Sequence, residues 1–237
     1  MSARGVLVGA LVLVLAAGGA VVADRVAVSA AQDAAVRELR ANVAGVTGTP
    51  EVAISGFPFL TQLLGGKLTD VTAHADGLTI DGVGVTDVNV DAVGVSTHVP
   101  YTIYRAVLTG ALSAGALQQL LATKAGVDLK LSINGDQLLA ATQVLGLDVT
   151  ATLVPRAENG KIRLAVATVT FGKLAVDVSA LPGRLGTQLK NLLVPVDGLP
   201  AGFALSGVVV RDGGVRITVT GRDVVLAPAT TGPTPSP

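Results

Sequence analysis

The side chains best suited to chemistry in this sequence are two histidines and several aspartates within segments rich in Val and Gly. His74 shares the polar side of a predicted strand with Asp70, Thr72 and Asp76, because alternate residues of a strand point to the same side. Such a group suits a metal site or proton transfer. The same spacing fits a histidine that faces solvent, and we favour this interpretation. His98 has no sequence neighbour that would activate it.

Three further aspartates, Asp81, Asp87 and Asp91, offer the oxygen ligands that calcium prefers, but without the spacing of an EF-hand loop. We interpret them as turn and strand-edge residues. The segment Gly82–Asp87 begins like a dinucleotide-binding loop, yet it lacks the third glycine and the following helix. The sequence also contains no nucleophile elbow, P-loop or His-Glu-x-x-His helix. We therefore expect a protein that is not an enzyme and that uses no cofactor and no metal.

The composition excludes several function classes. The chain has 237 residues, 17 Lys and Arg against 17 Asp and Glu, and no cysteine. A net charge of zero without a basic cluster argues against nucleic acid, and the absence of cysteine excludes disulfide scaffolds and thiolate-bound metals. Half of the residues are hydrophobic and only 14% are charged, where about 25% is ordinary. This apolar surplus fits either a thick Val and Leu core or a surface that contacts lipid.

Both ends of the chain differ from its middle. Arg4 precedes 19 uncharged residues, Gly5–Ala23, a run longer than the apolar part of a signal peptide and close to the length that spans a bilayer. Residues 1–30 are therefore predicted to be either a cleaved signal peptide or a retained transmembrane anchor, and both place the rest outside the cytoplasm. Residues 227–237 are rich in Pro and Thr and are predicted to be a disordered tail. The predicted domain spans residues 31–226.

Alternation of apolar and polar residues predicts strands in several parts of the middle region. These segments are residues 127–133, 147–153, 162–166, 174–178 and 215–219. Glu158-Asn159-Gly160 predicts a hairpin turn. The apolar phase changes between Val85 and Val88, which is typical of a β-bulge.

Helical periodicity is rarer. It predicts helices over residues 28–43, 112–121, about 137–145 and about 182–193. Ser113 is the predicted N-cap of the second of these, and Gly126 its C-terminal stop. Hairpin turns and short, regular spacing favour an α+β fold with an antiparallel sheet over a parallel one.

The segment 52–67, Val-Ala-Ile-Ser-Gly-Phe-Pro-Phe-Leu-Thr-Gln-Leu-Leu-Gly-Gly-Lys, resembles the opening motif of the LmeA-type phospholipid-binding proteins of actinobacterial cell envelopes. The similarity continues through 76–80, returns at 199–202 and 214–224, and covers about residues 50–226. The resemblance implies a tubular lipid-binding-like fold, in which a curved antiparallel sheet wraps around a few amphipathic helices. It also implies binding of anionic phospholipids and support for the maturation of mannosylated, lipomannan-type envelope lipids. No catalytic residues come with it.

Two groups of apolar residues are candidates for lipid contact. The first follows Gly56 and is hypothesised to line a cavity mouth or to touch the bilayer, although capping of the core fits equally: Phe57, Phe59, Leu60, Leu63 and Leu64. The second lies on leucine stripes and is placed along a groove, where Lys67, Lys124 or Lys190 would meet a lipid phosphate: Leu117, Leu120, Leu121, Leu189 and Leu192.

Three function classes follow. The first is a non-enzymatic phospholipid-binding or lipid-carrier protein of the cell envelope, with the membrane, anionic phospholipids and envelope glycolipid biosynthesis enzymes as partners. Removing an acyl chain of about 14 methylenes from water is worth on the order of 11 kcal/mol, so a carrier needs an uncharged groove. The alternative is a structural or adaptor protein that docks on an envelope enzyme through an apolar groove. The third is a hydrolase whose residues converge only in three dimensions.

Overall fold

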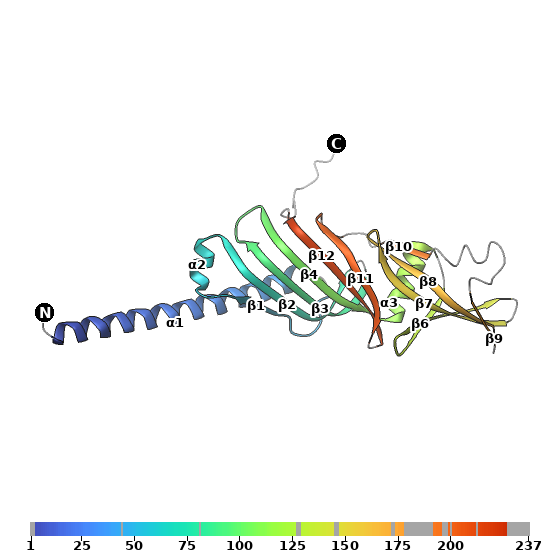
Figure 1. Ribbon diagram of the computed structural model, residues 1–237, viewed down its shortest axis with the longest axis horizontal. Coiled ribbons are helices and arrows are strands. Elements are labelled where there is room, and N and C mark those ends of the chain that lie inside the picture. Colours follow the sequence, from blue (N-terminus) through green and yellow to red (C-terminus); the bar gives the residue numbers. More distant parts are fainter. Residues whose placement is uncertain are drawn as a thin grey trace, which may run out of the picture.

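The computed structural model describes residues 3–43, 45–80, 82–126, 129–144, 147–171, 174–177, 192–195, 199, 201–211 and 213–226. In this part of the chain, one long N-terminal helix precedes two antiparallel sheets that lie end to end (Figure 1). The predicted α+β class with antiparallel strands is therefore confirmed. The strands are divided between two sheets rather than forming a single one, and neither sheet closes on itself.

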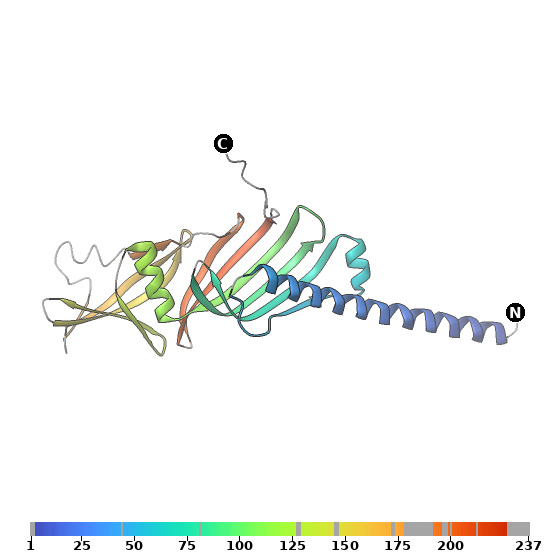
Figure 2. The same ribbon diagram turned by 180° about the vertical axis from the view of Figure 1, so that it is seen from behind.

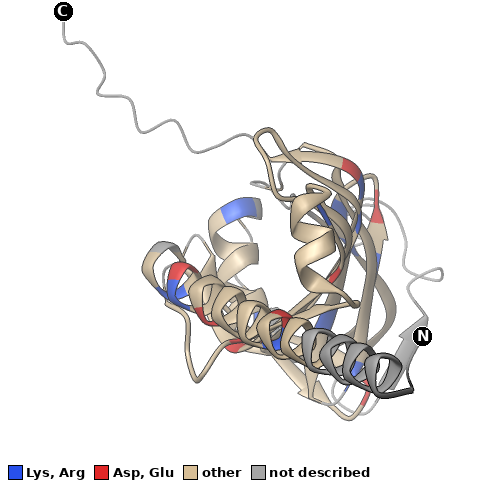
Figure 3. Cartoon of the chain, turned by 90° about the vertical axis from the view of Figure 1, so that its left-hand side faces the viewer, with Lys and Arg blue, Asp and Glu red and all other residues tan. Residues whose placement is uncertain are grey.

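The first sheet has the strand order β1-β2-β3-β4-β12-β11. Its strands are β1 Glu51–Ser55, β2 Lys67–Ile80, β3 Val83–Ser96, β4 Tyr101–Leu112, β11 Phe203–Arg211 and β12 Gly214–Leu226. Seen along the long axis of the molecule, this sheet is strongly curved, and its few charged residues are of both signs (Figure 3). Strands from the first half of the chain and the hairpin β11–β12 near its C-terminal end belong to this one sheet, because β12 pairs with β4.

The predicted β-bulge is confirmed in β3. The pairing of β3 with β4 shifts between Thr86 and Asn89, and Asp87 between them has a φ of 49°. The extra residue changes which positions face the interior: odd-numbered Val85 is buried before the bulge, and even-numbered Ala92 is buried after it. One long strand thus keeps its apolar side on the interior while the sheet bends.

The second sheet has the order β10-β8-β7-β6-β5, with β9 paired to β8. Its strands are β5 Lys130–Asn134, β6 Gln137–Val144, β7 Leu147–Glu158, β8 Lys161–Phe171, β9 Leu174–Asp177 and β10 Leu192–Pro195. The predicted hairpin turn joins β7 to β8: Asn159 and Gly160 have φ values of 48° and 73°, the positive values that a type I′ turn requires.

One helix prediction is wrong, and so are the last two residues of a second one. Residues 137–144 form strand β6 between β5 and β7, and Leu138 and Ala140 are buried at alternate positions. Pairing on both sides outweighs the helix propensity of this Leu- and Ala-rich segment. Leu192 and Leu193, the predicted end of another helix, lie in β10 and pair with β8. The preceding residues, 182–191, lie outside the described residues.

The helices are α1 Ala3–Asn42, α2 Phe59–Leu64 and α3 Ala114–Leu120, the last followed by a π-helical turn, η1 Leu121–Ala125. Ser113 caps α3 by accepting a hydrogen bond from the Ala116 amide at 3.1 Å, and Gly126 ends η1 with a φ of 65°. Both predicted boundaries are confirmed. From behind, α1 crosses in front of the first sheet and projects beyond it (Figure 2).

Helix α1 runs without interruption past residue 30, the predicted end of the N-terminal segment. Within the described residues, no helix has both the length and the apolar character needed to cross a bilayer.

The main core lies where α3 packs against both sheets. Leu117 of α3 and Leu121 of η1 are fully buried, together with Leu138, Leu164 and Val215 from the strands. These side chains come from segments distant in sequence, so burial of their apolar surface holds the two sheets together.

We expect Leu117→Ala to lower the free energy of unfolding by about 2–5 kcal/mol, because it leaves a cavity in this core. The exposed Leu64→Ala should change it by less than about 0.5 kcal/mol. Chemical denaturation of both variants checks this, and equal effects would contradict the assigned core.

Candidate lipid-binding site

A buried carboxylate joins the first two helices. Asp24 of α1 is only 2% exposed, and its Oδ1 accepts a hydrogen bond from the Leu60 amide at 2.8 Å. That amide lies in the first turn of α2, where no carbonyl of the same helix is available as an acceptor. Asp24 therefore caps α2 from another helix, since Pro58 at the N-cap position supplies no side-chain hydrogen bond.

The Gly-Phe-Pro-Phe-Leu-Thr-Gln motif forms the turn that leads into α2. Gly56 has a φ of 96°, and a Cβ there would lie 2.6 Å from Nε2 of Gln62. Gln62 in turn connects α2 to the sheet: its Nε2 donates to the Ser55 carbonyl at 3.3 Å, and its Oε1 accepts from the Thr69 amide at 2.8 Å. The motif thus fixes α2 at the edge of the first sheet.

One aromatic residue of this motif is buried and the other is exposed. Phe59 is 3% exposed and anchors α2, whereas Phe57 is 60% exposed. Arg25 lies over the Phe57 ring, with Cζ 5.1 Å from the ring centroid. Phe59 therefore belongs to the core, as the capping interpretation predicts, whereas Phe57 is exposed on the surface.

The exposed apolar residues of α2 lie beside those of α1, which contacts it. We call this surface the apolar tip, and it consists of Val21, Val22, Val26, Phe57, Leu60, Leu63 and Leu64. Leu64 is the most exposed of them, at 89%. The three valines of α1 were not among the predicted site residues, because they belong to the segment that was predicted to be a signal peptide or a membrane anchor.

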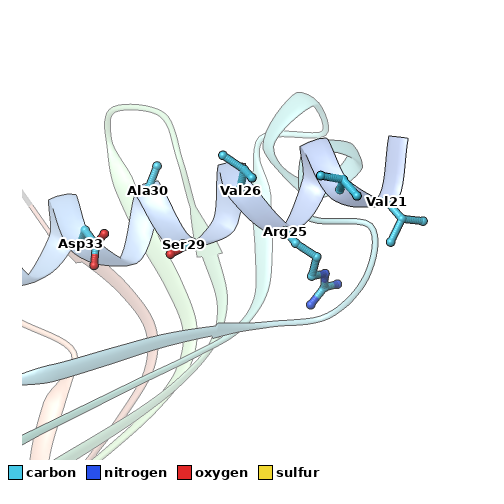
Figure 4. Close-up of a pocket in the computed structure, with 7 residues that line it drawn as sticks. Val21, Arg25, Val26, Ser29, Ala30 and Asp33 are labelled. Atoms are coloured by element: carbon cyan, nitrogen blue, oxygen red, sulfur yellow. The ribbon is translucent and has the colours of Figure 1, made fainter. Parts of the chain in front are cut away.

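An open hollow of about 510 Å³ lies along the α1 side of the apolar tip. Arg25 and Ser29 project from one side of α1, and Val26 and Ala30 from the opposite side (Figure 4). The residues around this open surface all come from α1, and they combine apolar side chains with a cation, a hydroxyl and the carboxylate of Asp33.

The second predicted group is not assembled into an open groove among the described residues. Leu117 and Leu121 are fully buried in the main core, and Leu120 packs against them. Leu192 lies in β10, and Leu189 lies outside the described residues. Whether lipid reaches these side chains stays a prediction.

The predicted phosphate-binding lysines are also separated. Lys67 opens β2 directly after α2 and lines a hollow with Tyr104. Lys124 lies in η1, beside the main core, and Lys190 lies outside the described residues.

A family model described as LmeA-like phospholipid-binding matches residues 22–220. The chain belongs to this family. Comparisons with curated proteins and with solved structures gave no match. Lipid is thus the ligand class of this LmeA-like chain, and a lipid-binding family suggests a role without catalysis. The match begins at Val22, so it includes Val22 and Val26 of the apolar tip but not Val21.

His74 and Asp87, two of the candidate metal ligands, belong to a polar network on the first sheet of this LmeA-like protein. His74 Nδ1 donates to Oδ1 of Asn89 at 2.9 Å, and Asn89 donates to Oδ1 of Asp87 at 3.0 Å. Arg216 donates to Oδ2 of Asp87 at 2.8 Å. Asp81 lies outside the described residues. In the part of the chain that the structure describes, no group of three or more His, Cys, Asp or Glu is placed to hold a metal.

This network shifts two titrations. Hydrogen bonding to Asn89, helped by the charges of Asp76 and Asp87, raises the pKa of His74 above its ordinary value of 6.5. The Arg216 guanidinium, with Asn89, lowers the pKa of Asp87. Both shifts favour the charged forms, so the residues act as a surface ion network.

We expect Asp24→Ala to lower the free energy of unfolding by about 1–2 kcal/mol, because it removes the cap of α2. Amide hydrogen exchange at Leu60 should become faster. Asp33→Ala, an exposed position of the same helix, is the matched control. Unchanged exchange at Leu60 would show that Asp24 does not hold α2.

We expect NMR titration to place the pKa of His74 above 6.5 in the unaltered protein and closer to 6.5 in Asn89→Ala. Because the folded-state pKa is raised, the stabilisation by protonated His74 is complete below about pH 6.5 and is lost as pH rises through the raised pKa. A pKa of 6.5 or lower in the unaltered protein would contradict the hydrogen bond to Asn89.

Proposed function

We propose that this protein binds phospholipids at a bilayer surface, where the apolar tip contacts the acyl region, and that it carries or presents them in the cell envelope. The observation that supports this is the exposure of seven large apolar side chains on α2, the turn before it and the adjoining part of α1. In a member of a phospholipid-binding family, an exposed apolar surface of this kind is best explained by lipid contact.

The energy available from the tip suits reversible binding. Complete burial of a Val, Leu or Phe side chain is worth about 1.5–3 kcal/mol. The tip residues are 37% to 89% exposed in the free protein, so each gains part of that amount on insertion. The combined gain is several kcal/mol, which is sufficient for contact with a membrane and for release from it.

A preference for anionic lipids is supported by cations beside the tip. Arg25 lies over Phe57, and Lys67 follows α2 after two glycines. With the tip in the acyl region, both would lie at the depth of the headgroups, where each cation contributes about 1 kcal/mol near an anionic surface.

The proposed location outside the cytoplasm is supported by the uncharged run Gly5–Ala23 behind Arg4. The role in maturation of mannosylated envelope lipids is supported by the family resemblance. There the protein would deliver or present lipid to the enzymes of that pathway rather than carry out a reaction itself. Docking on such an enzyme through the same tip is the alternative that the following experiment distinguishes.

We expect Phe57→Asp/Leu64→Asp to weaken binding to phosphatidylcholine vesicles at least about tenfold, since two exposed side chains lose apolar contact and gain charge. Phe59 is left unchanged because it is buried. Vesicle co-sedimentation measures the binding, and thermal unfolding verifies the fold.

Ile80→Asp is the matched control. Ile80 is also exposed, but it ends β2, whose other end lies next to α2. A strand of this length spans roughly 40 Å. The proposal fails if the double variant binds vesicles as well as the control does. A protein that binds no vesicles but captures an envelope enzyme through the tip would be an adaptor.

A further inference from the structure

Two arginines of the first sheet face each other without a neutralising partner. In the register of β4 and β12, Arg105 is directly opposite Arg222. Opposed side chains in such a pair have Cβ atoms about 4.5–5.5 Å apart, and like charges in this arrangement are destabilising. Within the described residues, no ion pair involves either arginine, and neither has an interaction beyond the contact of Arg105 with Tyr104 described below.

A second pair of opposed arginines shows the usual arrangement. Arg156 of β7 is directly opposite Arg163 of β8, but Arg163 donates to the carboxylate of Glu158 at 2.8 Å. The charge of that pair is therefore partly compensated inside the protein, whereas the charge of Arg105 and Arg222 is directed to solvent.

The sheet around Arg105 and Arg222 is hollowed. A hollow of about 350 Å³ is lined by both arginines together with Gly202, Thr220 and Gly221. This volume exceeds that of a phosphate group, and it offers two guanidinium groups and one hydroxyl. Arginine binds phosphate through two parallel N–H donors, which fix its orientation as well as its charge.

An adjoining hollow of about 370 Å³ adds a third cation. It is lined by Lys67, Tyr104 and Asp223 among others. Two of the cations lie near the Tyr104 ring: Nζ of Lys67 and Cζ of Arg105 are each 5.9 Å from its centroid. The three cations Lys67, Arg105 and Arg222 exceed the one carboxylate that lines the two hollows.

A glycine makes this arrangement possible. Gly94 has a φ of 69°, and a Cβ there would lie 2.9 Å from Cε of Lys67 and 3.0 Å from Cβ of Tyr104. Both side chains occupy the space that a side chain at position 94 would take. Lys67 and Tyr104 thus pack over a glycine whose backbone conformation other residues rarely adopt.

We propose that Arg105 and Arg222, with Lys67 and Tyr104 beside them, bind a phosphate group. The net charge of the chain is zero, so attraction of an anion to this site comes from the local cluster. A bound phosphate would accept hydrogen bonds from both guanidinium groups and relieve their mutual repulsion.

The position of the site favours the headgroup of a bilayer lipid as the source of the phosphate. Gly66 and Lys67, which line the adjoining hollow, directly follow α2. The site is carried by one end of each of the strands β2, β4 and β12. These strand ends lie on the same side of the first sheet as α2 (Figure 1). A lipid at the apolar tip would therefore present its phosphate on the side of this cluster. This source of phosphate rests on the proposed function, whereas the phosphate site itself does not.

The first experiment measures binding to vesicles of phosphatidylcholine alone and of phosphatidylcholine mixed with phosphatidylglycerol. The unaltered protein should bind the anionic vesicles more tightly. Arg105→Gln/Arg222→Gln should reduce this preference about tenfold or more. It should weaken binding to phosphatidylcholine much less, because the choline cation offsets the charge of that phosphate. Arg156→Gln/Arg163→Gln removes the same charge from the other opposed pair and should keep the preference.

The second experiment uses inorganic phosphate and glycerol phosphate as free ligands. The chain has no Trp and two Tyr, so in Tyr101→Phe the remaining tyrosine fluorescence reports on Tyr104. Phosphate should change this fluorescence saturably, chloride at equal ionic strength should not, and Arg105→Gln/Arg222→Gln should abolish the response. Thermal unfolding should show this double variant to be at least as stable as the parent, because a repulsion is removed.

The outcomes separate the two proposals. If the unaltered protein binds no vesicles but responds to phosphate, the phosphate site is supported with a free phosphate ester as its ligand, and the proposed bilayer contact fails. If neither free phosphate nor anionic vesicles distinguish Arg105→Gln/Arg222→Gln from Arg156→Gln/Arg163→Gln, the phosphate site is overturned, whatever the tip does.

Discussion

The hydrogen bond between the Asp24 carboxylate and the Leu60 amide holds α2 against α1, and the apolar tip depends on this contact. Helix α2 has only six residues, far fewer than an isolated helix needs in water. It is held by Asp24 on one side and by Gln62 on the other, with Phe59 buried beneath it. Without these contacts, the apolar side chains of α1 and α2 would not form one surface.

The same contact bears on the N-terminal segment. A peptidase cut after Ala30 would remove Asp24 together with the valines that α1 contributes to the tip. A cut after Ala23 would keep the carboxylate, and a retained anchor would keep the entire tip. Asp24 can therefore cap α2 only with a retained anchor or after a cut at Ala23.

Local patterns predicted much of the sheet structure. The alternation along Leu147–Leu153, the Asn159-Gly160 turn and the phase change before Val88 each depend on neighbouring residues, and each is confirmed. Residues 137–144 were wrongly predicted to be helical. Their conformation is decided by pairing with β5 and β7, and helix propensity, a property of the local sequence, carries no information about that pairing. The opposition of Arg105 and Arg222 was likewise invisible, since the register of two strands distant in sequence creates it.

The apolar surplus of the sequence has two places in the structure. One part fills the space between the sheets, where Leu117, Leu121 and Leu138 are fully buried against one another. A lipid chain could enter there only by displacing these contacts, at a cost comparable to that of opening a core cavity. The other part is exposed at the tip, on α2, the turn before it and the adjoining part of α1. Lipid contact at this edge needs no rearrangement of the core, so the edge, rather than the core, is the place where a lipid would first be bound.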